Sequence, residues 1–336
     1  MEILTINPGN VPTRLSWQEE LKSAFRDLGS LFKFLELKKS DFKNLDIPND
    51  DFPILVTRPF AGRMQKGEPA DPLLQQVILT HSAEPKQGKW SEDPVHDQEF
   101  EKATGVLQKY KGRALLIITG ACAIHCRYCF RQNFNYSAVV RQGIGEAIEW
   151  IRNDSTISEV ILSGGDPLLI TDQALARILE QLEAIGHVKR IRIHTRAPVV
   201  LPTRITPELL KRFSLCEKSI WVVLHINHAA EIDEMVVKMI EQLHSVRVTV
   251  LNQSVLLAQV NDRFEVQRDL CETLVNQGVL PYYLHLLDQV HGAQGYEVSQ
   301  DRGAQIIAKL RAELPGYAVP RLVKEVPGEA SKTLLR

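Results

Sequence analysis

The sequence predicts an α/β protein built around a partial barrel of six strand–helix units, with a mainly helical and irregular region before it. Two observations lead to this fold class. From residue 113 onward, short apolar runs alternate with amphipathic segments, as in folds whose parallel strands are covered by helices. Polar clusters follow the apolar runs, and in such barrels the carboxyl ends of the strands form the active-site face. The alternation alone would also allow a flat, doubly wound sheet.

The region before the barrel carries weaker signals. Apolar residues recur at helical spacing over residues 17–36, which predicts one amphipathic helix with a break near Gly29. Residues 42–112 are rich in proline, glycine and charge, so we expect an irregular lead-in with a short helix at Asp71-Pro72. The chain then divides into an N-terminal cap region over 1–112, a barrel core over 113–312 and a C-terminal segment over 313–336.

Six apolar runs in the core have the length of buried strands. They are Ala114–Thr119, Glu159–Ser163, Arg190–Thr195, Ile220–Ile226, Arg247–Leu251 and Leu280–Leu287. Helix-start signals lie between them. Thr206 precedes a proline at the first helical position, Thr171 or Asp172 can cap a helix over 173–185, and Asn261 or Asp262 can cap one over 263–277.

Each predicted strand is followed by a polar cluster. The clusters are residues 122–129, 163–167, 194–196, 225–228, 252–254 and Asp288. A single histidine or asparagine at a strand end is usually a structural hydrogen-bonding residue. Six clusters on one rim are better explained by one binding site at the mouth of the barrel.

Composition limits the classes of function. The 336 residues are 44% hydrophobic and 24% charged, as in ordinary globular proteins, and the net charge of −1 argues against nucleic acid as the main partner. Neither a signal peptide after Met1 nor an apolar run long enough to cross a membrane is evident, so we expect a cytoplasmic protein. Five cysteines, an odd number, favour a reducing compartment and metal binding over disulfides, with Cys216 and Cys271 in the core.

The other three cysteines, Cys122, Cys126 and Cys129, lie within eight residues of one another, directly after an apolar run. Crowded thiolates are soft ligands that suit zinc or an iron–sulfur cluster. In a four-iron cluster, three thiolates leave one iron free to bind a reactant, by the logic that distinguishes catalytic from structural zinc sites. The alternative is a zinc knuckle whose fourth ligand is His125.

This motif, with Tyr128 directly before the last cysteine, resembles the signature of the radical S-adenosylmethionine enzymes. The fold expected from that resemblance is the partial (βα)6 barrel of the radical SAM type. Residues 194–206, HTRAPVVLPTRIT, resemble more specifically the lysine 2,3-aminomutases. The similarity runs from about residue 90 to the C-terminus and is fainter before it. Because the sequence ends soon after Lys332, it is most similar to the short, elongation-factor-P-associated (EpmB-type) branch.

The resemblance implies a [4Fe-4S] cluster on Cys122, Cys126 and Cys129, together with S-adenosylmethionine and pyridoxal 5′-phosphate. It implies Lys332 as the catalytic lysine that carries pyridoxal phosphate, with cations for its phosphate. The cations are Arg113 and Lys109. The residues implied for S-adenosylmethionine are Tyr128, Gly164, Gly165, Asp166, His225 and Gln253.

The resemblance also implies a substrate, L-lysine, and the residues that hold its two ends. Arg131 would bind the α-carboxylate through its planar guanidinium, and Asp288 with Glu325 would bind the ε-ammonium. Glu325 stands where the family has aspartate, so one carboxylate is displaced by a methylene. The implied product is (R)-β-lysine, which a separate ligase attaches to elongation factor P, and an electron donor protein is implied as a further partner.

Two other interpretations are open at this stage. The chain could be another radical S-adenosylmethionine enzyme that does not use pyridoxal phosphate. It could also be a non-catalytic metal-binding module that docks on the translation machinery, in which case zinc would replace iron.

Overall fold

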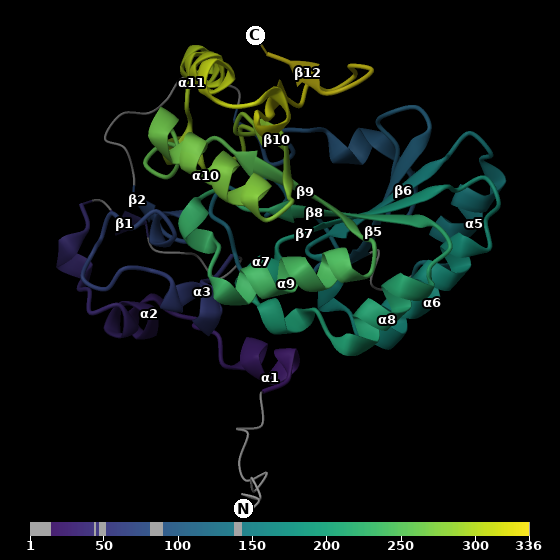
Figure 1. Ribbon diagram of the computed structural model, residues 1–336, viewed down its shortest axis with the longest axis horizontal. Coiled ribbons are helices and arrows are strands. Elements are labelled where there is room, and N and C mark those ends of the chain that lie inside the picture. The colour runs from purple at the N-terminus through teal and green to yellow at the C-terminus, as the bar shows by residue number, and fades with distance from the viewer. Residues whose placement is uncertain (1–14, 44, 47–51, 81–89, 138–142, 336) are drawn as a thin grey trace, which may run out of the picture.

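The computed structural model describes residues 15–43, 45–46, 52–80, 90–137 and 143–335. Its centre is a ten-stranded sheet in the order β12-β11-β10-β9-β8-β7-β6-β5-β4-β3 (Figure 1). Six of these strands are parallel neighbours in chain order. They are β5 (Arg113–Thr119), β6 (Glu159–Gly164), β7 (Arg190–Thr195), β8 (Ser219–His225), β9 (Thr249–Val255) and β10 (Leu280–His285).

Short strands extend this parallel set at both edges, and the sheet is not closed. β3 (Glu101–Ala103) and β4 (Val106–Leu107) add antiparallel strands beside β5. β11 (Arg321–Lys324) lies parallel to β10, and β12 (Thr333–Leu334) pairs antiparallel with β11. The strand order never reverses, as it would at the switch point of a doubly wound sheet. The predicted partial barrel is therefore confirmed.

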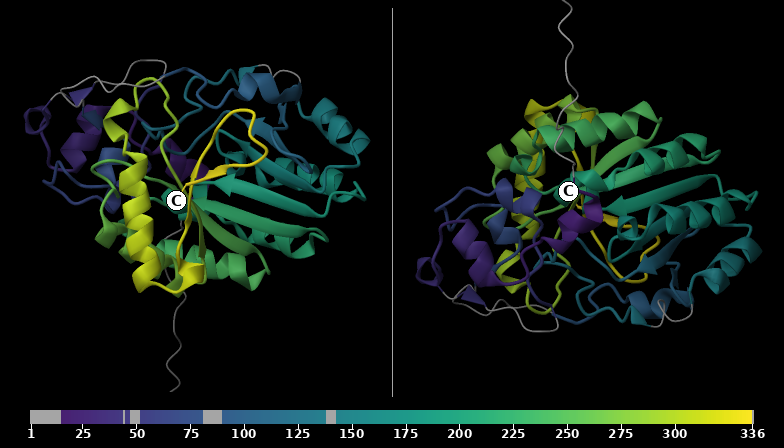
Figure 2. Two further views of the ribbon diagram at one scale, coloured as in Figure 1. Left: turned by 90° about the horizontal axis from the view of Figure 1, so that it is seen from above. Right: turned by 90° about the horizontal axis from the view of Figure 1, so that it is seen from below.

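Helices cover the outer face of the curved sheet, as the two views in Figure 2 show. They are α5 (Gly145–Asn153), α6 (Asp172–Glu183), α7 (Ala197–Val200), α8 (Pro207–Leu215), α9 (Glu234–Ser245), α10 (Phe264–Asn276) and α11 (Gln300–Glu313). The largest hydrophobic core lies between these helices and the strands and includes Leu116, Leu162 and Ile193. No helix in the described part of the chain is both long and apolar enough to pass through a bilayer.

The N-terminal region forms a second hydrophobic core that packs against the barrel. Its elements are α1 (Trp17–Lys22), α2 (Leu28–Phe34), α3 (Arg58–Gly62) and the pair β1 (Leu45–Asp46) and β2 (Leu79–Thr80). The single helix predicted over 17–36 is in fact two. The break comes before Asp27, whose side chain caps α2 by accepting a 2.8 Å hydrogen bond from the Ser30 amide, and Gly29 lies inside α2.

Single 3₁₀ turns connect many of these elements. They are η1 (Lys39–Asp41), η2 (Leu74–Gln76), η3 (Asp97–Phe100), η4 (Pro167–Leu169), η5 (Pro202–Arg204), η6 (Ala229–Glu231), η7 (Gln294–Tyr296) and η8 (Gly316–Ala318). The short helix expected at Asp71-Pro72 is the 3₁₀ turn η2, and the Asp71 carboxylate accepts from the Leu73 and Leu74 amides at 2.9 Å.

The predicted strand over 247–251 needs correction at both ends. Arg247 has a left-handed backbone conformation, with φ of 62°, that ends the turn after α9, so β9 starts only at Thr249. The strand then runs through the polar residues to Val255. Asn252 belongs inside it because its side-chain amide pairs with both the N–H and the C=O of Ile226, at 2.9 and 3.0 Å.

The predicted helix caps are correct for two helices and wrong for one. Thr171 and Thr206 accept hydrogen bonds from the third residues of α6 and α8, as expected. α10 instead begins after Arg263, which makes no side-chain cap. Asn261 is unavailable as a cap because its side chain bonds the Leu257 amide and the Asn227 carbonyl within the barrel.

Candidate active site

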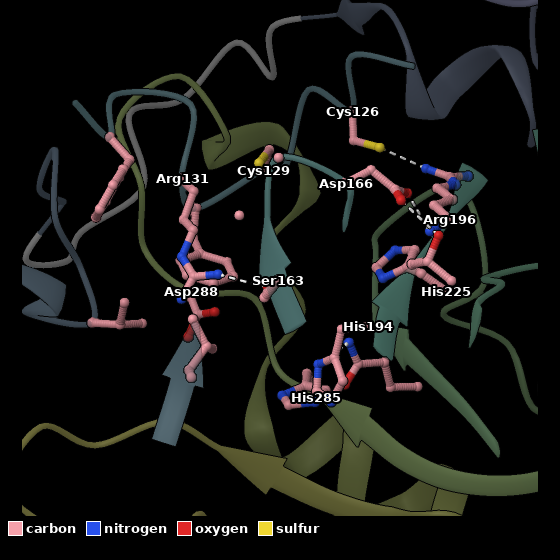
Figure 3. Close-up of a pocket in the computed structure, with 18 of the residues that line it drawn as sticks. Cys126, Cys129, Arg131, Ser163, Asp166, His194, Arg196, His225, His285 and Asp288 are labelled. Carbon is pink, nitrogen blue, oxygen red and sulfur yellow. Dashed lines mark hydrogen bonds between the residues drawn. The ribbon is translucent and has the colours of Figure 1, made fainter. Parts of the chain in front are cut away.

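A cavity of about 620 Å³ occupies the mouth and interior of the open barrel (Figure 3). All of the residues singled out from the sequence line it, from elements that lie far apart in the chain. They are Lys109, Arg113, Cys122, Cys126, Tyr128, Cys129, Arg131, Gly164, Gly165, Asp166, His225, Gln253, Asp288, Glu325 and Lys332. The cavity has two parts. The sulfur end comprises the lining residues within 120–130 and 164–166 with Arg196, and the charged end comprises Asp97, Lys109, Arg131, Glu325 and Lys332.

The cysteine loop follows β5 and is held by backbone hydrogen bonds to the N-terminal region. The His125 amide donates to Leu55 O at 3.0 Å, and the Arg127 amide donates to Gln76 O at 3.1 Å. Burial raises the pKa of the Cys122 thiol and raises that of Cys129 to about 11. A bound metal would act against this effect, because it favours the deprotonated ligand.

The loop geometry bears on what kind of metal site could form. Within the described residues, no three His, Cys, Asp or Glu side chains converge on one point as the ligands of a single ion do. A four-iron cluster does not need such convergence, since each thiolate binds a different iron. His125, the fourth ligand in the zinc alternative, is hydrogen bonded through Nδ1 to Pro53 O at 2.8 Å and stacks on Phe52.

Gly164 and Gly165 allow the loop after β6 to lie directly against the cysteine loop. A Cβ on Gly164 would come within 2.3 Å of Thr119 O, and one on Gly165 within 2.4 Å of Ala121 O. Gly164 also has a φ of 130°, which side chains rarely adopt. The close contact between the ends of β5 and β6 and the residues after them therefore requires glycine at both positions, and the predicted contact of these glycines with a ligand stays a prediction.

Asp166 has a full set of protein partners. Its carboxylate accepts from the Thr195 hydroxyl and from the Arg196 and Ala197 amides, all at 2.7 Å. It also accepts from the Leu168 amide at 3.1 Å. Asp166 thus ties the loop after β6 to the end of β7, and its role in the structure is to position these two elements.

Sequence reasoning missed the residue at the centre of the sulfur end, Arg196. Its Nη1 lies 2.7 Å from Cys126 Sγ and 2.6 Å from the Tyr128 hydroxyl, while Nη2 bonds Gln76 and Glu231. The stretch that contains Arg196 was recognised as a family pattern, but nothing in the sequence showed which of its residues would face the cysteines. Three of these partners, Cys126, Tyr128 and Gln76, lie more than 60 residues away in the sequence.

Tyr128 is a buried member of the same network. Only 5% of it is exposed, its ring stacks on His225, and its hydroxyl lies 2.9 Å from His225 Nε2 and accepts from Asn227 at 2.7 Å. The ring therefore forms a wall of the cavity next to the cysteines.

Three histidines line the floor of the cavity and are neutral. Burial, followed by nearby positive charges, lowers the pKa of His194 and His285 well below 6.5, and lowers that of His225 to about 3. Gln253 lies 3.5 Å from His194 Nδ1, and the buried His194 Nε2 lacks a hydrogen-bond partner among the described residues. Neutral, incompletely paired groups of this kind suit a polar organic ligand.

The charged end is a chain of alternating ion pairs. Lys332 Nζ lies 2.5 Å from Glu325 Oε2, and Glu325 is also 4.0 Å from Lys109. Lys109 pairs with Asp97 at 2.8 Å, and Asp97 pairs with Arg131 Nε at 2.7 Å. Asp97, with a side chain only 2% exposed, was also missed in the sequence. The only signal for it was its place within the stretch, from about residue 90 onward, over which the family resemblance runs.

Arg113 fits a phosphate group by its position and its free donor. Its guanidinium lies over the Tyr110 ring at 4.9 Å, and its buried Nε makes no hydrogen bond to any described residue. Tyr110 in turn donates a 2.6 Å hydrogen bond to Glu325 Oε1. The segment before β5 and the segment after β11 therefore meet across the open side of the sheet.

Asp288 is a cavity carboxylate whose pKa is raised. Burial raises its pKa to about 6, although the positive charge of Lys332 opposes the shift. For Glu325 the balance is reversed. Burial acts to raise its pKa, but Lys332 and Tyr110 hold it below its usual range. A bound ammonium group near both carboxylates would favour ionisation of Asp288.

Comparison with known proteins identifies close relatives. The family model for the radical SAM superfamily matches residues 116–263. The chain is 41% identical to L-lysine 2,3-aminomutase of Escherichia coli strain K12, over 97% of this chain and 96% of that protein. It is 33% identical to L-lysine 2,3-aminomutase of Clostridium subterminale, over 94% of this chain and 77% of that protein. A radical SAM methyltransferase from Sphaerobacter thermophilus aligns with a TM-score of 0.47 at 17% identity, over 66% of this chain and 71% of the other.

Proposed function

This chain belongs to the L-lysine 2,3-aminomutase family within the radical SAM superfamily and is an isomerase, and we propose that it converts L-α-lysine to β-lysine in the cavity of the open barrel. The observation that carries the proposal is that both halves of the required chemistry line one cavity. The cysteines lie at one end, and Lys332 with the carboxylates lies at the other. This arrangement argues against the two alternatives, which are a radical enzyme without pyridoxal phosphate and a non-catalytic metal-binding module.

The family implies a [4Fe-4S] cluster, S-adenosylmethionine and pyridoxal phosphate, and the residues present fit them. Cys122, Cys126 and Cys129 would hold the cluster. When bound, the three groups supply an electron, a hydrogen-abstracting radical and an aldehyde conjugated to an electron-accepting ring. The residues that would hold S-adenosylmethionine all line the cavity, namely Gly164, Gly165, Asp166, Tyr128, His225 and Gln253. Asp166 would act there by fixing the loop, because its oxygens are already occupied.

At the other end, Lys332 would carry pyridoxal phosphate, and Arg113 and Lys109 would face its phosphate. In the structure the Lys332 amine is held by an ion pair with Glu325. An amine attacks an aldehyde through a free lone pair, so the Glu325 contact has to be released before the reaction. Glu325 would then be free to accept another cation.

Two of the groups that would hold the substrate's charged ends, Arg131 and Glu325, are now paired with other side chains of the cavity. Arg131 would bind the α-carboxylate through its terminal nitrogens, one of which now donates to Ser163, and Asp97 would keep the guanidinium in place. Asp288 and Glu325 would bind the ε-ammonium that replaces the charge of Lys332. Fixing both ends determines which carbon faces the sulfur end, and positioning is the main contribution of the protein in such reactions.

We further infer that the product is (R)-β-lysine and that it serves the modification of elongation factor P through a separate ligase, with an electron donor protein as partner. This inference is supported by the resemblance to the elongation-factor-P-associated branch and by the 41% identity to the Escherichia coli relative, compared with 33% to the Clostridium relative.

The deciding experiment is anaerobic incubation of the reconstituted protein with S-adenosylmethionine, a strong reductant and L-lysine, followed by chiral identification of the product. Formation of β-lysine only when pyridoxal phosphate is present supports the proposal. Cleavage of S-adenosylmethionine without any β-lysine would favour a different radical enzyme. Zinc in place of iron, with no cleavage, would favour a non-catalytic module.

A further inference from the structure

We propose that Arg196 sets the reduction potential of the cluster through its hydrogen bond to Cys126, and that Glu231 limits its effect by balancing its charge. The inference rests on the proposed function, because it takes the three cysteines as the cluster ligands. Figure 3 shows the contact: the guanidinium points at the sulfur, with Nη1 2.7 Å from Sγ. Arg196 is a positioning and tuning residue in this proposal.

The guanidinium is held through both terminal nitrogens, although its buried Nε makes no hydrogen bond to a described residue. The Arg196 backbone amide donates to Asp166 at 2.7 Å, and Nη2 donates to Gln76 at 2.6 Å and to Glu231 at 3.0 Å. Only 7% of Arg196 is exposed, and its planar group lies 5.3 Å from the centre of the Phe60 ring. A donor held in this way does not reorganise when the charge on the sulfur changes.

The direction of the effect follows from charge. A cluster with three thiolate ligands is negative, and reduction adds one more electron to it. A fixed positive charge and a hydrogen bond to a ligand sulfur stabilise the reduced form more than the oxidised form, and such contacts are among the determinants of cluster potentials. The contact lies in a buried, weakly screened environment, where a charge acts more strongly than at the surface.

Glu231 carries the opposite charge and is fully buried. Its carboxylate accepts from Arg196, from the Gln76 side chain at 3.1 Å and from the Asn227 amide at 2.9 Å. It therefore holds the guanidinium in place and also cancels part of its field at the cluster. The two residues should shift the potential in opposite directions when each is neutralised.

The test uses the full-length protein, reconstituted anaerobically with iron and sulfide and titrated potentiometrically while the reduced cluster is followed by electron paramagnetic resonance. We expect R196Q to lower the equilibrium constant for one-electron reduction by about tenfold, which corresponds to about 59 mV. R196K, which keeps the charge, should shift it less, and E231Q should shift it upward. R212Q is the control: Arg212 is a half-buried guanidinium that pairs with Glu183 and does not line the cavity, so its loss should leave the potential nearly unchanged.

The outcomes separate the two proposals. A wild-type protein that never shows a four-iron signal rejects the proposed function itself. A normal signal whose potential is the same in R196Q, E231Q and wild type rejects the tuning role alone. If R196Q takes up no iron, E231Q decides: an upward shift supports the proposal, and an unchanged potential overturns it.

Discussion

The two ends of the cavity are stabilised in different ways. At the sulfur end, loops are locked by backbone hydrogen bonds and by buried groups such as Asp166, whose oxygens all have protein partners. At the charged end, long side chains are held by one another, and the Lys332 side chain remains 24% exposed. The sulfur end is thus preorganised, whereas the charged end contains ion pairs that a ligand can replace. A site that must exchange a covalent partner requires the second kind of construction.

The largest expected effect is the loss of every function of the sulfur end with no change at the charged end. Replacing Cys126 by alanine should remove the cluster and abolish cleavage of S-adenosylmethionine, while pyridoxal phosphate still binds at Lys332. Iron analysis and detection of 5′-deoxyadenosine measure the first two effects. Wild-type levels of cleavage in this variant would show that Cys126 is not a ligand.

The complementary change is Lys332→Ala. It should lower mutase activity by on the order of 10³-fold or more, since the residue proposed to carry the aldehyde is lost. Iron content should be unchanged, because no sulfur-end group depends on Lys332. Borohydride reduction of the wild type followed by peptide mapping tests the same assignment directly, and label on any other lysine would contradict it.

Glu325→Gln should have an intermediate effect confined to the substrate. Loss of one opposite charge in a partly dry site costs ~1–3 kcal/mol, so the KM for lysine should rise roughly 10- to 100-fold. Dissociation constants for S-adenosylmethionine should stay close to the wild-type value. If both ligands weaken equally, the two ends are not independent.

The smallest effect is on stability, and its sign depends on pH. The Asp288 pKa is raised from 3.8 to about 6, so the folded protein holds a proton that the unfolded chain releases between these values. Above pH 6 the buried carboxyl must ionise, and stability present at low pH is lost. Asp288→Asn should therefore stabilise the ligand-free protein by about 1–2 kcal/mol at pH 8 and hardly at all below pH 4, as measured by urea unfolding.

Glu325→Gln provides the internal control for this pH dependence. The Glu325 pKa is lowered in the folded state, so its ionised form contributes stability above its usual pKa that is lost as pH falls. Its removal should destabilise the protein at pH 8 and have little effect under acidic conditions. Equal responses of the two variants would show that Lys332 does not distinguish between these carboxylates.

Most of the barrel could be predicted from the sequence because its signals are local. Buried parallel strands give apolar runs, Thr171 and Thr206 mark helix starts, and the six polar clusters follow from strand direction. Local signals failed where a side chain forms hydrogen bonds with a distant segment. Asn261 has the residue type of a helix cap, but its side chain forms hydrogen bonds with Asn227 and Leu257. Likewise β9 continues through Asn252 because the Asn252 side chain forms a hydrogen bond with the Ile226 amide.

The same distinction applies to the site. Every residue marked by the family resemblance lines the cavity, although its role stays a prediction. Arg196 and Asp97 could not be found in this way, because their importance comes from partners that only folding brings together. The contacts of Arg196 with Gln76 span 120 residues, and those of Asp97 with Arg131 span 34. A pattern in a single sequence does not specify such pairings.

The open side of the sheet has a consequence for how the protein is made. Glu325, Ser331 and Lys332 form part of the cavity wall, and Tyr110 reaches across to Glu325. Because these residues follow the six parallel strands in the sequence, all six strands leave the ribosome before this wall exists. The barrel is therefore open on this side until the segment after β10 has been added.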